Sequence, residues 1–343
     1  MRKLLNTLFI TSEHAHLTLD GETVCIEIQK KKAGQFPLHT LESIISFSYS
    51  GATPTFMGAC AKRGINLAFF SPFGKFLCRI AGESRGNVLL RKQQYRISDN
   101  DAASCIVARN FILGKIFNSR WSIDRTVRDH GLRVNAEQCR KAIQYLTKAM
   151  DKIKVEEDLA TLRGVEGEAA TVYFGVFDEL ILNQKEDFYF HGRNRRPPQD
   201  YMNAMLSFGY TLLANDCAGA LEGVGLDSYV GFMHRDRPGR KSLALDLMEE
   251  LRPVLVDRFI LTMVNNRQIR REHFAVSESG AVEFMDAGKK KFLTAWQEHK
   301  KEQLTHPYLN EKICWGLVPH VQSLLLARYL RGDLDGYPPF LWK

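Results

Sequence analysis

Hydrophobic and polar positions alternate along the N-terminal part of the chain, as they do in β-strands that bury one face. Leu17 and Leu19 precede the dipeptide Asp20-Gly21, and alternating apolar residues follow it as far as Ile28. An Asp-Gly pair between two such runs is a strong signal for a β-hairpin. A short helix is predicted at 53–61, where Thr53 can cap the first turn. Further strands are predicted for the apolar runs at 44–47, 65–70 and 76–80.

From about Ser98 the apolar residues recur every three or four positions, which is the spacing of one face of a helix. Helices are therefore predicted across 106–117, 142–153, 202–221 and 315–330. Two more are predicted to begin after a break at Gly164 and at Ser242. The expected fold class is α+β, with a small N-terminal β-rich domain at 1–92, a linker at 93–100 and a larger all-α domain at 101–343. Within the helical domain we expect a small β-ribbon near 274–284 and a Pro-rich C-terminal tail that packs back onto the domain or meets a partner.

Composition favours a soluble, cytoplasmic protein with a polyanionic partner. The 343 residues exceed the usual size of one compact core, and Lys and Arg outnumber Asp and Glu by 47 to 39. The seven cysteines lie singly, so zinc-knuckle and thioredoxin-like sites have no support and reduced thiols are expected. No uncharged apolar run approaches the ~20 residues of a membrane span, and the N-terminal apolar stretch is too short for a signal peptide.

Candidate chemistry lies in acidic residues and one histidine on separate segments. Glu166 lies in one predicted helix, Asp246, Glu249 and Glu250 lie in another, and His234 precedes a Pro-Gly loop. Positions three and four apart share a helix face, so carboxylates at this spacing repel one another unless a cation lies between them. Oxygen ligands suit Mg²⁺ or Mn²⁺, and an imidazole shifts the preference towards Mn²⁺. On a basic chain this combination indicates a metal-dependent enzyme acting on a phosphodiester.

Each of these residues also has an ordinary structural explanation. Acidic residues at this spacing usually form a solvated helix face, and a single histidine is usually a surface or hydrogen-bonded residue. Glu166 could instead stabilise a helix N-terminus after Gly164 through the helix dipole. Taken one at a time, the residues do not decide the function.

The sequence around these residues resembles a known family, CRISPR-associated protein one, the integrase of spacer acquisition. Leu-Arg-Gly-Val-Glu-Gly-Glu-Ala-Ala-Thr-Val-Tyr-Phe at 162–174 resembles its first catalytic motif. Gly-Phe-Met-His at 231–234, followed by Arg-Pro-Gly, resembles the second, and residues 242–253 resemble the third. The order of a β domain before an α domain also agrees, so the resemblance covers essentially the whole chain. The tail at 331–343 further resembles members from the I-C subtype of CRISPR systems.

The resemblance implies a site and a reaction. Glu166, His234 and Asp246 would bind Mg²⁺ or Mn²⁺, and Glu249 would be a fourth catalytic residue, with Glu250 as the alternative in that role. The implied reaction joins the 3′-hydroxyl ends of new spacer DNA to the CRISPR repeat by transesterification. With water as the nucleophile, the same site would be an endonuclease.

Basic and aromatic residues near these motifs are predicted to contact DNA, because phosphates need cations and unpaired bases stack on aromatic rings. Tyr173 has a second explanation, since aromatic residues at helical spacing usually belong to a core. The candidate DNA-binding residues are Arg163, Tyr173, Arg193, Arg195, Arg196, Arg237, Arg240 and Lys241.

The resemblance also implies partners: double-stranded DNA with 3′ ends, CRISPR repeat DNA, a second copy of the chain bound through the β domain, CRISPR-associated protein two and an end-trimming CRISPR-associated exonuclease. Two other functions remain open. The chain could be a metal-dependent nuclease that acts on branched DNA in repair, or a non-catalytic nucleic-acid-binding subunit. Joining of a labelled 3′ end to target DNA distinguishes an integrase from the first, and metal-dependent activity distinguishes an enzyme from the second.

Overall fold

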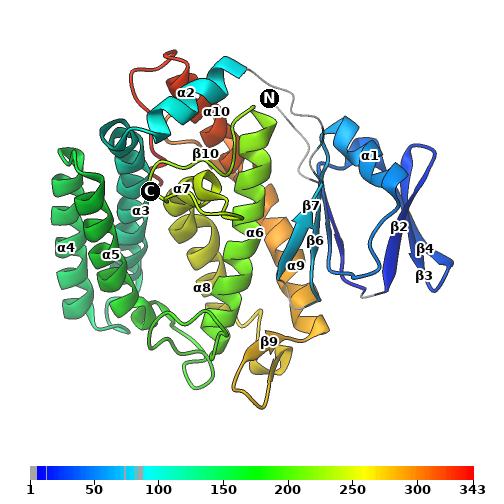
Figure 1. Ribbon diagram of the computed structural model, residues 1–343. Coiled ribbons are helices and arrows are strands. Elements are labelled where there is room, and N and C mark those ends of the chain that lie inside the picture. Colours follow the sequence, from blue (N-terminus) through cyan, green and yellow to red (C-terminus); the bar gives the residue numbers. More distant parts are fainter. Residues whose placement is uncertain (1–5, 13, 73–74, 81, 83–87) are drawn as a thin grey trace. The chain divides into compact units, whose positions relative to one another are not determined.

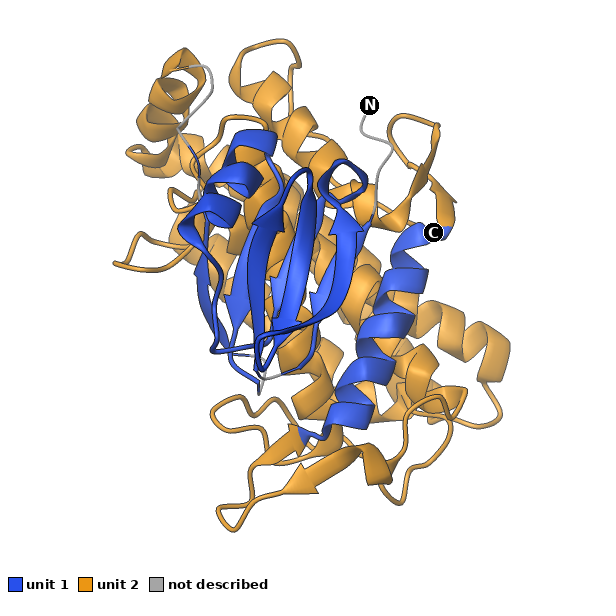
Figure 2. Ribbon diagram, turned by 90° about the vertical axis from the view of Figure 1, so that its right-hand side faces the viewer, with its two compact units in different colours: residues 1–85, 284–302 blue, residues 86–283, 303–343 orange. Residues whose placement is uncertain are grey.

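A computed structural model describes residues 6–12, 14–72, 75–80, 82 and 88–343 (Figure 1). The chain forms two compact units, one of residues 1–85 with 284–302 and one of residues 86–283 with 303–343 (Figure 2). Within the described ranges, no helix has both the length and the apolar character that a membrane span requires. An N-terminal β-rich region followed by a mostly helical one confirms the expected α+β class.

The first unit contains two sheets. Strands β2 (Ala15–Asp20), β3 (Thr23–Ile28) and β4 (Lys31–Pro37) form an antiparallel meander, in which Asp20 pairs with Thr23 and the predicted hairpin is confirmed. The second sheet has the order β1-β5-β6-β7, and its first three strands are parallel to one another. Its strands are β1 (Thr7–Ile10), β5 (Ser43–Ser46), β6 (Asn66–Phe70) and β7 (Phe76–Arg79).

Two helices complete the first unit. Helix α1 (Pro54–Arg63) begins as predicted, because the Thr53 hydroxyl accepts a hydrogen bond from the Phe56 amide at 3.3 Å. Phe56 is fully buried together with apolar side chains of β2, β3, β5 and β6. Helix α9 (Asp286–Lys301) belongs to this unit, although it lies far along the chain (Figure 2). The ammonium group of Lys289 on this helix lies 5.9 Å from the centre of the Phe47 ring.

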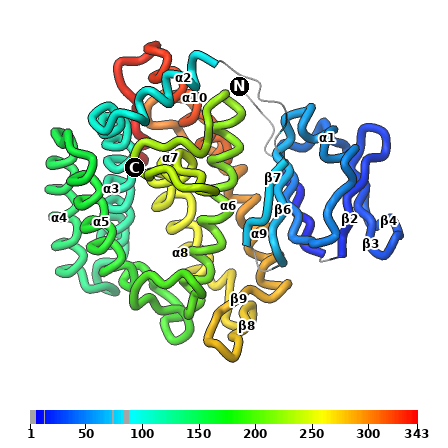
Figure 3. Tube along the Cα trace, in the orientation of Figure 1, coloured from blue at the N-terminus to red at the C-terminus, as the bar shows by residue number. Residues whose placement is uncertain are grey.

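The second unit is built mainly from helices, which follow one another from cyan to red in Figure 3. Two short β-ribbons join them, formed by β8 (Phe274–Val276) with β9 (Val282–Phe284) and by β10 (Gln303–Thr305) with β11 (Lys312–Cys314). The first ribbon is the predicted one. The helices are α2 (Val88–Ser98), α3 (Asp101–His130), α4 (Ala136–Lys154), α5 (Leu159–Gly175), α6 (Tyr201–Gly223), α7 (Ser242–Leu251), α8 (Arg258–Asn265) and α10 (Val318–Leu330).

Three boundaries differ from the sequence-based expectation. Residues 93–98, expected in a linker, belong to helix α2. Helix α5 does not begin after Gly164 but at Leu159, because the Asp158 carboxylate caps the amide of Thr161 at 2.6 Å. Glu166 therefore lies in the interior of the helix, where it cannot act on the helix N-terminus. Helix α10 begins at Val318, after a short 3-10 turn.

The C-terminal tail packs back onto the second unit. Tyr337 and Phe340 are only 2% and 0% exposed. The Phe340 amide donates to the Glu250 carboxylate at 2.7 Å, and the Tyr337 hydroxyl donates to the same carboxylate. Asn118 of α3 donates to the Phe340 carbonyl at 2.8 Å and accepts from the Trp342 amide at 3.1 Å. The tail is thus fixed to helices α3 and α7, which carry the candidate site.

Candidate active site

Asp246 holds the loop that carries His234. Its carboxylate is fully buried and accepts hydrogen bonds from the backbone amides of Phe232 at 2.6 Å, Met233 at 3.0 Å and His234 at 3.0 Å. The loop can come this close because residue 231 is glycine: a Cβ there would lie 2.8 Å from an oxygen of Asp246. Both carboxylate oxygens are therefore occupied in fixing the backbone of the loop.

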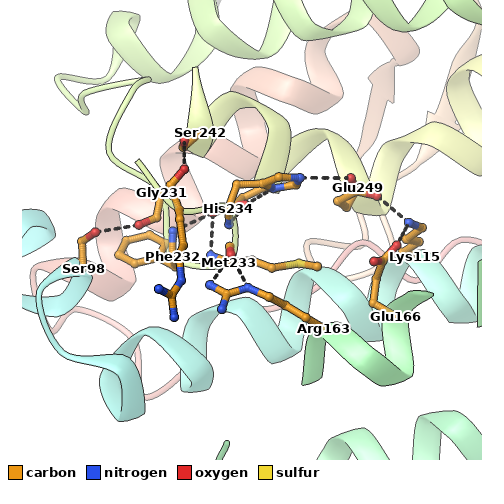
Figure 4. Close-up of polar contacts among 12 residues, drawn as sticks. Ser98, Lys115, Arg163, Glu166, Gly231, Phe232, Met233, His234, Ser242 and Glu249 are labelled. Carbon is orange, nitrogen blue, oxygen red and sulfur yellow. Dashed lines mark hydrogen bonds and ion pairs between the residues drawn. The ribbon is translucent and has the colours of Figure 1, made fainter. Parts of the chain in front are cut away.

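Asp246 also orients the imidazole ring. Nδ1 of His234 lies 2.6 Å from Oδ1 of Asp246, and an ionised carboxylate can only accept, so Nδ1 carries a proton in this contact. In the neutral ring the lone pair is then on Nε2, which faces Oε1 of Glu249 at 4.0 Å. Figure 4 shows the imidazole directed along the line to Glu249 and Lys115. This is the arrangement in which a histidine offers one nitrogen as a metal ligand while the other is fixed by a carboxylate.

Lys115 links the two glutamates of the site. Its ammonium group forms ion pairs with Glu166 and with Oε2 of Glu249, the latter at 2.7 Å. Helix α3 supplies Lys115, α5 supplies Glu166 and α7 supplies Glu249, so three helices meet at one cation (Figure 4). Burial acts to lower the pKa of Lys115, but the Glu249 and Glu166 carboxylates outweigh it and the pKa is raised. The lysine is therefore charged at neutral pH.

Glu249 is ionised at neutral pH despite its burial. Burial acts to raise its pKa, but Arg252, whose Nη1 lies 3.1 Å from Oε1, and Lys115 lower that pKa to about 2. Its side chain is only 4% exposed. Within the described part of the chain, its Oε2 has the Lys115 ammonium, at 2.7 Å, as its polar partner. A buried, ionised oxygen of this kind retains the capacity to coordinate a cation.

Glu250 faces a different part of the protein from Glu249. It accepts hydrogen bonds from Tyr337, from the Phe340 amide and from Nε2 of Gln322, the last at 3.0 Å. Burial raises the pKa of Glu250 to about 7, although these donors lower it. Adjacent residues on a helix point about 100° apart, so only one of the two glutamates can face Lys115. That residue is Glu249.

The side chains of the site include possible ligands for a divalent cation. Within the described ranges, no group of three or more His, Cys, Asp or Glu side chains is gathered closely enough to hold a metal ion as it stands. Nevertheless Glu166 and Glu249 already converge on a positive charge, and Nε2 of His234 faces the same glutamate. Two carboxylates and one imidazole are ligands that suit Mn²⁺ and Mg²⁺. The chemistry of the donors therefore fits such an ion.

The predicted DNA-binding residues divide into two groups. Arg163 donates from Nε and Nη2 to the carbonyl of Met233, at 2.9 and 2.7 Å, and so supports the His234 loop. Arg193 is half-buried, donates to Asn203 and lies over the ring of Tyr210. The side chains left at the surface are those of Arg195, Arg196 and Arg237, with Arg240 and Lys241 half-exposed.

Tyr173 is a core residue. It is 3% exposed, and its hydroxyl donates to Asp257 at 3.0 Å, while Tyr210 donates to the other oxygen of Asp257 at 2.6 Å. A buried ring held in this way cannot stack on a DNA base, so the core explanation of Tyr173 is the correct one and its prediction as a DNA contact is wrong. Burial raises the pKa of Asp257 to about 6.

Sequence reasoning missed Lys115 and Arg252. Lys115 follows the buried residues Phe111 and Ile112 by four and three positions, so it lies on the buried stripe of α3. A lysine at such a position signals a buried partner, because an unpaired charge would be expensive there. Arg252 follows Glu249 by three positions, which is the spacing of a helical ion pair.

Comparison with known proteins shows to which family this chain belongs. The sequence model described as CRISPR associated protein Cas1 matches residues 8–298. The chain belongs to the Cas1 family. It is 48% identical to the CRISPR-associated endonuclease Cas1 2 of Rhodospirillum rubrum and 44% identical to the CRISPR-associated endonuclease Cas1 1 of Chlorobaculum tepidum. Both alignments cover 100% of this chain and 100% of the relative. A Cas4 exonuclease/Cas1 endonuclease fusion of Geobacter sulfurreducens is 32% identical over 98% of this chain and 60% of the fusion.

Solved structures show the same fold. A casposase bound to its integration product superposes with a TM-score of 0.83 at 23% identity, covering 98% of this chain and 93% of that one. The Cas1 fold also matches a chain of a Cas6-RT-Cas1–Cas2 complex with a TM-score of 0.81 at 19% identity, covering 100% of this chain and 36% of that one. At these identities the solved structures show the fold alone, whereas the family model and the relatives place the chain among the CRISPR-associated Cas1 endonucleases.

Proposed function

We propose that this chain is a metal-dependent DNA integrase of CRISPR adaptation, which joins 3′-hydroxyl ends of spacer DNA to the CRISPR repeat by transesterification. The observation that carries the proposal is the convergence of Glu166 and Glu249 on one buried cation, with Nε2 of His234 lying 4.0 Å from Oε1 of Glu249. Glu249, and not Asp246, is the third proposed ligand, because hydrogen bonds to the His234 loop already occupy both oxygens of Asp246.

A divalent ion held by these three residues would neutralise phosphate charge and lower the pKa of an attacking hydroxyl. The protein's own residues do the rest. Asp246 keeps the proton on Nδ1 of His234 and so keeps Nε2 available, and Arg163 holds the loop through the Met233 carbonyl. Arg252 fixes the Glu249 carboxylate at 3.1 Å.

The surface arginines supply the contact with DNA in this proposal. Arg195 and Arg196 lie exposed before α6, and Arg237 lies exposed three residues after His234. Guanidinium groups at the surface can bind the phosphates of the donor and target strands, while the acidic site engages the scissile one. Water as nucleophile gives the endonuclease reaction from the same site.

The proposed partners rest on the relatives. The fused Cas4 exonuclease of the Geobacter protein supports an end-trimming exonuclease as partner, and the Cas1–Cas2 complex supports assembly with CRISPR-associated protein two. A homodimer formed through the β-rich unit, membership of the I-C subtype and a cytoplasmic location are part of the same proposal. Co-purification from the native host tests the homodimer and the two protein partners.

One assay tests the proposed function. A duplex with a labelled 3′ end is incubated with a supercoiled plasmid carrying the repeat, with the protein alone and with CRISPR-associated protein two. We expect label to enter the plasmid with Mn²⁺ or Mg²⁺, to be lost in EDTA and to return when Mn²⁺ is added in excess. Nicking of the plasmid without transfer of label would favour the repair nuclease, and binding without either product would favour the non-catalytic subunit.

A further inference from the structure

The ammonium group of Lys115 lies between the carboxylates of Glu166 and Glu249, where the proposed divalent cation would bind. Its side chain is 12% exposed, and those of Glu166 and Glu249 are 20% and 4% exposed. Two ionised glutamates this well shielded from water would repel one another strongly without a positive charge between them. The lysine therefore stabilises this pair of carboxylates when no divalent ion is present.

The packing of α3 against α7 places Lys115 there. A Cβ at Gly114 would lie 2.7 Å from Cβ of Glu250, so only glycine lets the two helices approach this closely. Gly114 and Lys115 are neighbours on α3, as Glu249 and Glu250 are on α7. Close contact of Gly114 with Glu250 thus brings their neighbours in the chain, Lys115 and Glu249, together, with Nζ of Lys115 2.7 Å from Oε2 of Glu249. The C-terminal tail fixes Glu250 from the other side.

The ammonium group and a divalent ion compete for the same oxygens. The ammonium contacts one oxygen of Glu166 and Oε2 of Glu249, and the latter oxygen has no other partner in the described structure. A cation coordinated by those oxygens needs them at bonding distance, and it would also repel a positive charge held beside it. The two arrangements therefore exclude each other.

We propose that Lys115 is an internal counter-ion that holds Glu166 and Glu249 together in the metal-free protein and leaves them when a divalent cation binds. The inference rests on the proposed function, because it takes the same two glutamates as ligands. Lys115 is a positioning residue: it keeps carboxylates from α5 and α7 preassembled, and it weakens metal binding by the cost of its own displacement.

Metal binding measured directly tests the inference without any catalytic readout. Mn²⁺ is titrated calorimetrically into the full-length wild type, Lys115→Met and Lys115→Arg, and each protein is also melted in EDTA. The matched control is Lys141→Met, since Lys141 pairs with Glu137 at 2.7 Å but lies exposed on α4. We expect Lys115→Met to bind Mn²⁺ on the order of tenfold more tightly than the wild type, because the competing charge is gone.

The melting temperatures provide the second arm. In EDTA, Lys115→Met is expected to melt roughly a few degrees below the wild type, and saturating Mn²⁺ is expected to remove most of that difference. Lys115→Arg and Lys141→Met should stay close to the wild type in both measurements. Unchanged or weaker Mn²⁺ binding by Lys115→Met, with normal binding by the wild type, would overturn the inference alone. Absence of Mn²⁺ binding by the wild type would overturn the metal site and the inference together.

Discussion

Replacing Asp246 by alanine should release the loop that carries His234. The substitution removes the acceptor for three backbone amides, those of Phe232, Met233 and His234, and for Nδ1 of the imidazole. His234→Ala is the matched comparison, because it removes only the last of these bonds and leaves the loop attached to Asp246. Both variants lose a residue of the site, but only the first leaves buried donors without an acceptor.

The magnitude follows from the number of stranded donors. A buried donor left without an acceptor costs about 1–3 kcal/mol, and each 1.4 kcal/mol is a factor of about ten in an equilibrium constant. Opening of each of the three amides should therefore become about five- to a hundredfold more favourable in Asp246→Ala. In His234→Ala the loss is one hydrogen bond from a partly exposed ring, which predicts a change of about threefold.

Hydrogen exchange measures this opening locally, which suits a chain of two compact units better than a global unfolding curve. Exchange is followed by mass spectrometry on a peptide that contains residues 231–235. We expect fast exchange of these amides in Asp246→Ala and near-native exchange in His234→Ala. Equal protection in both variants would show that Asp246 does not hold the loop, and would return it to the proposed metal ligands.

Three further predictions concern the surroundings of the site. Gly114→Ala places a Cβ 2.7 Å from that of Glu250, so we expect a loss of about 1–3 kcal/mol in the free energy of unfolding and weaker Mn²⁺ binding. A variant as stable as the wild type would contradict the close packing of α3 against α7. Tyr173→Phe should leave DNA affinity unchanged, because the ring is buried, whereas replacing the exposed Arg195 and Arg196 by alanine should weaken DNA binding and reduce its salt dependence. Filter binding at several salt concentrations measures both effects. Weaker binding by Tyr173→Phe than by the double arginine variant would refute the assignment of the arginines as DNA contacts. Burial raises the pKa of Asp257 from 3.8 to about 6, so the unfolded chain releases this proton at lower pH than the folded protein does. As the pH rises from 4 to 6, wild-type stability should therefore fall by about 2 kcal/mol more than that of Asp257→Asn, and parallel pH curves for the two proteins would contradict the burial effect.

Local patterns in the sequence were sufficient for the order of elements and for most of the chemistry. The Asp20-Gly21 hairpin, the Thr53 cap and the amphipathic face of α4 depend on neighbouring residues only, and all three are present. The parallel pairing of β1 with β5 joins residues far apart in sequence, and no local pattern predicts it. The same holds for α9, whose membership of the first unit depends on long-range packing.

The roles within the site needed the three-dimensional structure. Sequence patterns identified the acidic residues and the histidine, but they could not show that both oxygens of Asp246 bind the His234 loop. Nor could they separate Glu249 from Glu250, because both are buried on one helix and only their partners differ. Tyr173 was predicted to contact DNA because it is an aromatic residue near the first motif, whereas its partner Asp257 lies 84 positions away in the chain.

Strand transfer by variants at two neighbouring residues, Glu249 and Glu250, most directly tests the claim that Glu249 is the third metal ligand. Glu249→Gln and Glu250→Gln are compared with the wild type in the labelled 3′-end assay with Mn²⁺. Glu249 pairs with Lys115, so the account predicts a loss of roughly a hundredfold or more in Glu249→Gln. Among the described residues, Glu250 contacts the C-terminal tail, Gln322 and Gly114 of α3, and none of these belongs to the proposed metal site. Glu250→Gln should therefore retain transfer within about tenfold of the wild type. Full transfer by Glu249→Gln, or its loss in Glu250→Gln alone, would contradict the account.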